Sequence, residues 1–214
     1  MFKVYLADDH AILREGLKAM MTNNTELMVA GESGTGRETI RDIDAGEYDL
    51  LVLDMVLPDM DGFDVLMRVK RSRPNLLVMI LTLRIDETLA IRLLKSGAVG
   101  YAVKAMPPLQ IIDAMRRVLR GERFLAPELA AMIASRVSTQ QKGSLHERLS
   151  NREYTIFIKL ASGLSITEIA NELHIAPSTV STHRTHILEK LELTSNADLV
   201  RYAVSLESPA YVSE

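Results

Sequence analysis

Residues suited to phosphoryl chemistry follow several short apolar segments in the first half of the chain. Asp8 and Asp9 come directly after the first such segment, and Asp54 ends the stretch LLVLD, which precedes a proline-containing turn. Thr82 and Lys104 follow two further apolar segments. Three carboxylates repel one another unless a cation lies among them, and an oxygen-rich set suits Mg²⁺. Because a hydroxyl and an ammonium group suit the charged oxygens of a phosphoryl group, the set predicts phosphoryl transfer onto Asp54.

This chemistry requires the five residues to meet, and the periodicity of the first half predicts how they do so. Short apolar runs bounded by turn residues alternate with helical patterns. We expect strands at 4–7, 27–30, 50–53, 77–81 and 99–103, and helices at 12–21, 37–45, 63–71, 86–96 and 108–120. Such alternation predicts a parallel sheet covered on both faces, whose ligands bind beyond the carboxyl ends of the strands.

The strands stop after Gly121, which predicts a second, different domain. The stretch APELAAMIASRV is typical of one more helix, and STQQKGS is polar and aperiodic, as linkers are. From there the patterns are helical only, with capping-box spacings at Ser150–Glu153 and Ser165–Glu168. We predict a first domain at 1–121, a linker helix and flexible linker at 122–144, and a small all-α domain at 145–214.

The composition excludes several classes of protein. Hydrophobic residues make up 47% of the 214 residues and charged residues 25%, so the chain can bury a core. There is no cysteine, which excludes disulfides, thiolate metal sites and a cysteine nucleophile. No apolar run approaches the roughly 18 residues of a membrane span, and the start of the chain has no secretory pattern. We expect a cytoplasmic protein without a membrane partner.

The motifs LADDH, LDMVLPDMDG, LTL and GYAVK occur in the order and spacing of a receiver domain, so the first half resembles the response-regulator family. The resemblance implies a five-stranded, flavodoxin-like parallel sheet. It also implies that Asp54 accepts a phosphoryl group from a cognate sensor histidine kinase, assisted by Lys104. Thr82 is expected to turn toward that group, and Tyr101 to follow as an aromatic switch. Tyr101 can alternatively be an ordinary core residue.

The same resemblance implies a Mg²⁺ site. Asp9 and Asp54 would ligate the metal, Asp8 would act largely through water, and the backbone carbonyl of Val56 would complete the protein ligands. His10 follows the acids, but we expect it to open the first helix rather than to bind metal. Leu83 follows Thr82 where receivers usually have a small residue, so it is expected to crowd the entry to the site.

The stretch from Leu149 to Leu193 resembles the LuxR/FixJ-type (NarL subfamily) helix-turn-helix domain, whose third helix enters the major groove of DNA. Val180, Ile187, Leu188 and Leu191 recur at helical spacing and are expected to pack inward. The expected DNA contacts are Ser178, Thr179, Ser181, Thr182, His183, Arg184, Thr185 and Lys190. His183 can equally be a packed structural histidine.

The charge of this second domain limits what one copy can bind. From Leu145 onward six Lys and Arg stand against nine Asp and Glu. Since affinity for nucleic acid depends on neutralising phosphates, a monomer should bind DNA weakly. Two linked copies bind one duplex more tightly than a single copy, because the second binds at a high effective concentration. The apolar face of NADLVRYAVSLE is the expected surface of a homodimer, and it can alternatively be ordinary core of the domain.

These observations favour a phosphorylation-activated response regulator that binds promoter DNA as a dimer and is not an enzyme. A phosphohydrolase of the haloacid-dehalogenase kind would need an acid two residues after Asp54, where the chain has Val56. The alternative that stays open is a phosphorylation-independent regulator that acts through protein contacts.

Overall fold

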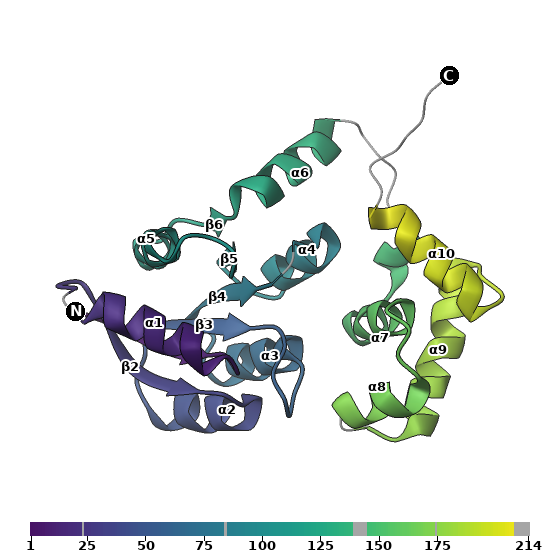
Figure 1. The fold of residues 1–214 in the computed structure, drawn as a ribbon, viewed down its shortest axis with the longest axis horizontal. Helices are drawn as coiled ribbons and strands as arrows, with labels where there is room; N and C mark the ends of the chain where they lie inside the picture. The colour runs from purple at the N-terminus through teal and green to yellow at the C-terminus, as the bar shows by residue number, and fades with distance from the viewer. Residues whose placement is uncertain (23, 84, 139–144, 174, 208–214) are drawn as a thin grey trace. The chain divides into compact units, whose positions relative to one another are not determined.

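The structure is a computed structural model that describes residues 1–22, 24–83, 85–138, 145–173 and 175–207. It divides into two compact units, residues 1–140 and 141–214, which Figure 1 colours from purple to green and from green to yellow. The predicted polar linker at 138–144 lies outside the described residues, except for its first.

A parallel sheet in the order β2-β1-β3-β4-β5-β6 forms the centre of the first unit. Its strands are β1 (Phe2–Ala7), β2 (Leu27–Ser33), β3 (Leu50–Asp54), β4 (Leu77–Thr82), β5 (Gly100–Val103) and β6 (Phe124–Leu125). The helices of this unit are α1 (Ala11–Met21), α2 (Gly36–Ala45), α3 (Gly62–Ser72), α4 (Glu87–Lys95), α5 (Pro108–Leu119) and α6 (Pro127–Ser138). The order of the strands reverses between β1 and β3, which is where doubly wound sheets bind their ligands.

Helices cover both faces of this sheet, as the unbroken apolar strands predicted. All five residues of β3 are buried, because a strand covered on both faces has no solvent side. The helices α1 and α5 contact each other, as do α2 and α3 (Figure 1). Each helix turns one apolar stripe to the sheet; in α1 the buried residues are Leu17 and Met21.

The prediction of five strands ending at residue 121 was wrong in one detail, because a sixth strand follows. The amide of Phe124 donates to the carbonyl of Val99 at 3.2 Å, and that of Ala126 donates to Tyr101 at 2.8 Å. Leu129 of α6 is fully buried in the same core. The first unit therefore includes the segment that we expected to be a linker helix. A two-residue strand has no apolar run or alternation that periodicity could detect.

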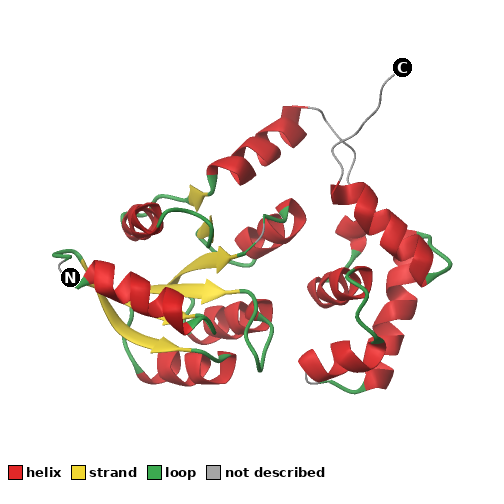
Figure 2. Cartoon of the chain, in the orientation of Figure 1, coloured by secondary structure: helices red, strands yellow, loops and turns green. Residues whose placement is uncertain are grey.

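The second unit is helical throughout its described residues (Figure 2). It comprises the 3₁₀ helix η1 (Leu145–Arg148), α7 (Asn151–Ala161), α8 (Ile166–Glu172), α9 (Pro177–Leu191) and α10 (Asn196–Glu207). Both predicted capping boxes are confirmed: Ser150 with Glu153 begins α7, and Ser165 with Glu168 begins α8. Within the described parts of both units, none of the helices has the length and apolar character needed to cross a bilayer.

Candidate functional site

The ends of three strands bring an ammonium group and two carboxylates together. Asp8 follows β1, Asp54 ends β3, and Lys104 follows β5. Lys104 Nζ lies 2.6 Å from Asp54 Oδ2 and 2.8 Å from Asp8 Oδ2. All three side chains are at most 6% exposed, so solvent screens this cluster little. The predicted meeting of these residues is therefore present in the fold.

Asp9 and His10 complete the cluster on its solvent side. His10 Nδ1 lies 2.6 Å from Asp9 Oδ1, 3.1 Å from Asp8 Oδ1 and 3.2 Å from Lys104 Nζ. His10 occupies the N-cap position of α1, as expected, but its side chain makes no capping hydrogen bond. His10 was not among the predicted site residues, although its place directly after the acid pair was a signal.

The electrostatics favour a site that receives positive charge. Burial raises the pKa of Asp54, while the hydrogen bond and charge of Lys104 oppose that rise and the charge of Asp8 adds to it. Asp8 Oδ2 is buried and forms an ion pair with Lys104, but the contact lacks hydrogen-bond geometry. One ammonium group thus faces three carboxylates, an arrangement that a divalent cation would relieve.

The loop after β3 is held close to Asp54. The amide of Val56 donates to Asp54 Oδ1 at 3.3 Å, and that of Gly62 donates to the carbonyl of Met55 at 3.0 Å. A side chain at position 62 would collide with the backbone of Asp54 and Met55, so glycine is required there. Val56 is 63% exposed, and the contact it makes with Asp54 comes from its backbone amide.

Thr82 is joined to the cluster through its backbone, whereas Tyr101 is a buried residue of β5. Thr82 ends β4 one position beyond the residue paired with Asp54, and its carbonyl accepts the amide of Lys104 at 2.7 Å. Tyr101 is fully buried, and burial raises its pKa to about 12, with a backbone hydrogen bond from Asp86 opposing the rise. Leu83 is 60% exposed.

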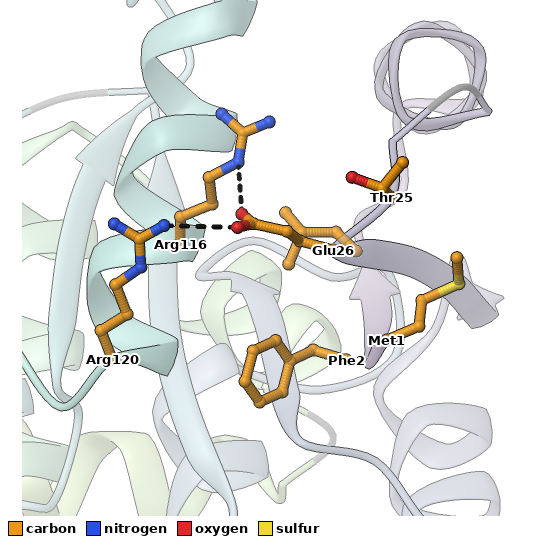
Figure 3. Close-up of a pocket in the computed structure, with 7 residues that line it drawn as sticks. Met1, Phe2, Thr25, Glu26, Arg116 and Arg120 are labelled. Carbon is orange, nitrogen blue, oxygen red and sulfur yellow. Dashed lines mark hydrogen bonds and ion pairs between the residues drawn. The ribbon is translucent and has the colours of Figure 1, made fainter.

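A separate pocket lies at the start of β1, at the amino end of the strand that carries the acids at its other end (Figure 3). Its lining includes Phe2, Glu26, Arg116 and Arg120. Glu26 pairs with Arg116 at 3.2 Å and with Arg120 at 3.4 Å, as the dashed lines in Figure 3 show. None of the predicted site residues lines it.

The exposed side of α9 agrees with the prediction of a DNA-reading face. Val180, Ile187 and Leu191 are buried, and Leu188 is partly buried, as expected for the inward stripe. The predicted contact residues that are exposed are Ser178, Thr179, Ser181, Thr182, Thr185 and Lys190. The helix begins at Pro177 after Ala176, which provides no side-chain cap.

The cations of α9 already have partners within the domain. Lys190 Nζ lies 2.6 Å from Oε2 of buried Glu153, and Arg184 Nε donates to Asn196 Oδ1 at 2.6 Å. His183 Nδ1 is buried without a hydrogen-bond partner among the described residues, and burial lowers the pKa of this histidine. Two of the hydroxyl residues have partners as well, since Thr182 Oγ1 donates to the carbonyl of Ser178 at 3.0 Å and Thr185 Oγ1 donates to that of Ser181 at 3.2 Å. His186 is exposed on the same helix and was not among the predicted contacts.

The helix α10 combines a packed face with an exposed apolar one. Leu199 is fully buried, whereas Val200 and Val204, one turn apart on another side of the helix, are 37% and 57% exposed. The Tyr202 hydroxyl lies 3.1 Å from Nδ1 of His146 in η1, which ties α10 to the start of the domain. Exposed apolar side chains that lie together are typical of an interaction surface.

Comparison with protein families supports both resemblances. Residues 4–116 match the family described as "Response regulator receiver domain". Residues 147–203 match the family described as "Bacterial regulatory proteins, luxR family".

Individual relatives match over nearly the whole chain. The response regulator protein VraR of Staphylococcus aureus is 33% identical over 201 residues, which cover 94% of this chain and 95% of VraR. A structure of the RcsB response regulator of Salmonella typhimurium superposes with a TM-score of 0.74 at 24% identity, covering 96% of this chain and 98% of RcsB. A structure of the response regulator ChrA, from a heme-sensing two-component system, has a TM-score of 0.52 at 30% identity, covering 96% and 98%.

Proposed function

Since the chain belongs to the response regulators that join a receiver domain to a LuxR-family DNA-binding domain, we propose that it accepts a phosphoryl group on Asp54 from a sensor histidine kinase and then binds promoter DNA as a dimer to regulate transcription. The observation that carries this proposal is the Lys104 ammonium group between two buried carboxylates, 2.6 Å from Asp54 and 2.8 Å from Asp8. A buried carboxylate beside a fixed cation is a nucleophile for phosphorus, because the cation offsets the charge that arrives.

The transfer step exchanges one bond to phosphorus for another. A carboxylate oxygen of Asp54 forms a bond to phosphorus while the bond from phosphorus to the donor histidine nitrogen breaks, and the electron pair of that bond leaves with the histidine. Lys104 neutralises one phosphoryl oxygen, and the hydroxyl of Thr82 and the amide of Val56 donate hydrogen bonds to others. The amide of Val56 already faces the Asp54 carboxylate at 3.3 Å.

The receiver family implies Mg²⁺, and the residues present fit that metal. Asp8, Asp9, Asp54 and the backbone carbonyl of Val56 would hold it. The three carboxylates and the backbone carbonyl are hard oxygen ligands, and the buried Asp8 Oδ2 has an ion-pair partner but no hydrogen-bond donor among the described residues. When bound, the metal supplies further neutralisation of the phosphoryl oxygens.

Phosphorylation would act on the loop after β4 and on Tyr101. A phosphoryl group adds about −1.5 to −2 charges and three acceptor oxygens, which favours a Thr82 side chain turned inward. Tyr101 is the expected follower, because it is buried in β5 and meets the backbone of Asp86, which caps α4. A rearrangement at Thr82 would therefore reach the start of α4.

Binding of DNA would use the exposed face of α9 in the major groove. The hydroxyl residues of that face, Ser178, Thr179, Ser181, Thr182 and Thr185, suit contacts to bases and phosphates. Arg184, Lys190 and His183 are proposed as flanking contacts. To bind phosphate, Arg184 and Lys190 would have to leave Asn196 and Glu153, and the His183 ring would have to become more exposed. A dimer formed through Val200 and Val204 of α10 would join two such helices on one duplex, which offsets the small cationic surplus of each. We place the protein in the cytoplasm, where DNA and the kinase domain are accessible.

The first experiment tests Asp54 as the phosphoacceptor. The intact protein is incubated with a small phosphodonor and Mg²⁺, and its mass is followed together with that of the Asp54→Ala variant. The expected result is a gain of one phosphoryl group in the wild type only. A gain that survives in Asp54→Ala would assign the phosphoryl group to another residue.

The second experiment tests the regulatory role. Genomic fragments are selected for binding to the phosphorylated protein at low salt, with Asp54→Ala as the control. Enrichment of a common sequence with two half-sites is expected for the phosphorylated wild type. Absence of any enriched fragment in either protein would remove the transcriptional role.

A second candidate function is regulation by protein contact without phosphorylation. It is favoured by the acidic balance of the second domain, six Lys and Arg against nine Asp and Glu, and by the internal pairing of Lys190. This candidate would be supported if the phosphodonor gave no mass gain and if wild type and Asp54→Ala bound DNA equally.

A further inference from the structure

His10 lies in the acid cluster with a ring nitrogen directed at it. Its Nδ1 atom lies 2.6 Å from Asp9 Oδ1, 3.1 Å from Asp8 Oδ1 and 3.2 Å from Lys104 Nζ. Nδ1 of the His10 ring is therefore directed at the cluster, although the histidine side chain is 52% exposed.

The backbone of His10 is held in place, so this position is not that of a free surface side chain. The His10 amide donates to Asp8 Oδ1 at 2.8 Å, and its carbonyl accepts the amides of Leu13 and Arg14 in the first turn of α1. The ring thus begins from a fixed Cα, and only its two side-chain torsions need to be ordered for Nδ1 to reach the cluster.

Four donor atoms then converge on one place. Asp8, Asp9, His10 and Asp54 each contribute one ligand atom, and these atoms all lie within 4.8 Å of one another. Ligands about 2.1 Å from a shared ion lie at most about 4.2 Å apart, so a shift of a few tenths of an ångström brings the set into coordination range. Buried Asp8 Oδ2, which accepts no hydrogen bond, belongs to the same cluster.

We infer that His10 Nδ1 is a metal ligand and gives this site a preference for borderline first-row cations, such as Co²⁺, Ni²⁺ and Zn²⁺, over Mg²⁺. The inference rests on the proposed metal site of the receiver. A set of carboxylate oxygens suits Mg²⁺, whereas one imidazole nitrogen adds affinity for borderline metals and little for Mg²⁺. His10 thereby determines which metal the pocket selects, in addition to opening α1.

The test measures binding of Mg²⁺ and of Co²⁺ to the full chain by titration calorimetry. The variant is His10→Asn, because asparagine is a preferred N-cap residue and keeps α1 intact while removing the imidazole. The expected result is a loss of about tenfold or more in Co²⁺ affinity with Mg²⁺ affinity changed by less than about twofold. Parallel changes for the two metals, or no change, would overturn the role of His10.

A second variant and a spectroscopic measurement distinguish failure of this inference from failure of the metal site itself. Asp54→Asn is expected to weaken the binding of both metals. If it weakens the binding of neither, the pocket is not a metal site, and both the proposed metal site and the role of His10 are wrong. Pulsed electron paramagnetic resonance of the Co²⁺-loaded protein is expected to show a nitrogen coupling that disappears in His10→Asn. A nitrogen coupling that is absent from the wild type, or unchanged in His10→Asn, would show that the metal binds without this ligand.

Discussion

At the scale of single residues, the carboxylates of the site repel one another, and a bound cation would reduce that repulsion. Lys104 balances only part of the charge of Asp8, Asp9 and Asp54, and Asp54 is 2% exposed. Burial raises the pKa of Asp54 even with Lys104 at 2.6 Å, so the ionised form of this carboxyl destabilises the folded state. The same imbalance is what makes the site receptive to a cation and to a neutralised phosphoryl group.

Asp54→Asn is therefore expected to raise the free energy of unfolding of the first unit at pH 7 by about 1 kcal/mol, a usual size for one substitution. Because the folded-state pKa of Asp54 is raised, its destabilising effect is complete above that pKa and fades as pH falls toward the unfolded value of 3.8. Urea unfolding at several pH values measures the difference. A gain that grows as pH falls would contradict this electrostatic account.

Glu153 is the opposite case, a buried carboxylate that stabilises its domain. Burial tends to raise its pKa, but the hydrogen bonds from Lys190 and Ser150 prevail and lower it. A lowered folded-state pKa means that the stabilisation is present above the unfolded value of 4.5 and is lost as pH falls through the folded value.

Glu153→Gln should accordingly destabilise the second unit at pH 7 by about 1.5–3 kcal/mol, the range for hydrogen bonds to a charged group. Thermal unfolding at pH 7 and below pH 4 checks this, and the difference between variant and wild type should shrink in acid. Glu192→Gln, at the exposed ion pair with Arg148, is the matched control and is expected to change little at either pH.

At the scale of elements, three helix starts of the second unit differ in their caps. Ser150 and Ser165 each accept a hydrogen bond from the amide three residues on, whereas α9 begins after Ala176 without a side-chain cap. The backbone of Ala176 is already extended, with φ −67° and ψ 143°, which is the conformation of an N-cap residue. The helix proposed to read DNA is thus the least well terminated of the three.

Ala176→Ser is expected to stabilise the second unit by about 1 kcal/mol, because serine can cap α9 without a change of backbone. Ser165→Ala, the reverse change at α8, is expected to cost about 0.5–2 kcal/mol. The two variants are compared by thermal unfolding. If Ala176→Ser proved neutral while Ser165→Ala destabilised, the α9 terminus would not be limited by its cap.

At the scale of the whole molecule, the first unit is larger than the alternation of strands and helices indicates. The strand β6 covers the edge of β5, and Phe124, Ala126 and Leu129 are buried in the core of the sheet. The segment that leads toward the second unit is thereby part of the receiver, and α6 contacts α4. The helix α4 therefore has a neighbour, α6, in the segment that leads out of the domain, so a change in α4 can affect that segment.

A fragment of residues 1–140 is expected to be more stable than a fragment of residues 1–121. Each large apolar side chain that loses its cover costs roughly 1.5–3 kcal/mol, and the shorter fragment also leaves the edge of β5 unpaired. Urea unfolding of the two fragments measures the difference. Equal stabilities would mean that β6 and α6 rest on the domain without supporting it.

The sequence by itself determined the order of the main helices and strands apart from β6, the two capping boxes, and the meeting of Asp8, Asp9, Asp54 and Lys104, because hydrophobic periodicity, local hydrogen bonds and strand-end position are local properties. Only the tertiary structure decided that β6 joins the sheet, that the His10 ring turns toward the acids, and that Lys190 pairs with Glu153 37 residues away. These outcomes depend on contacts between segments distant in the chain. Whether a side chain pairs with such a segment or points to solvent leaves no periodic pattern in the sequence.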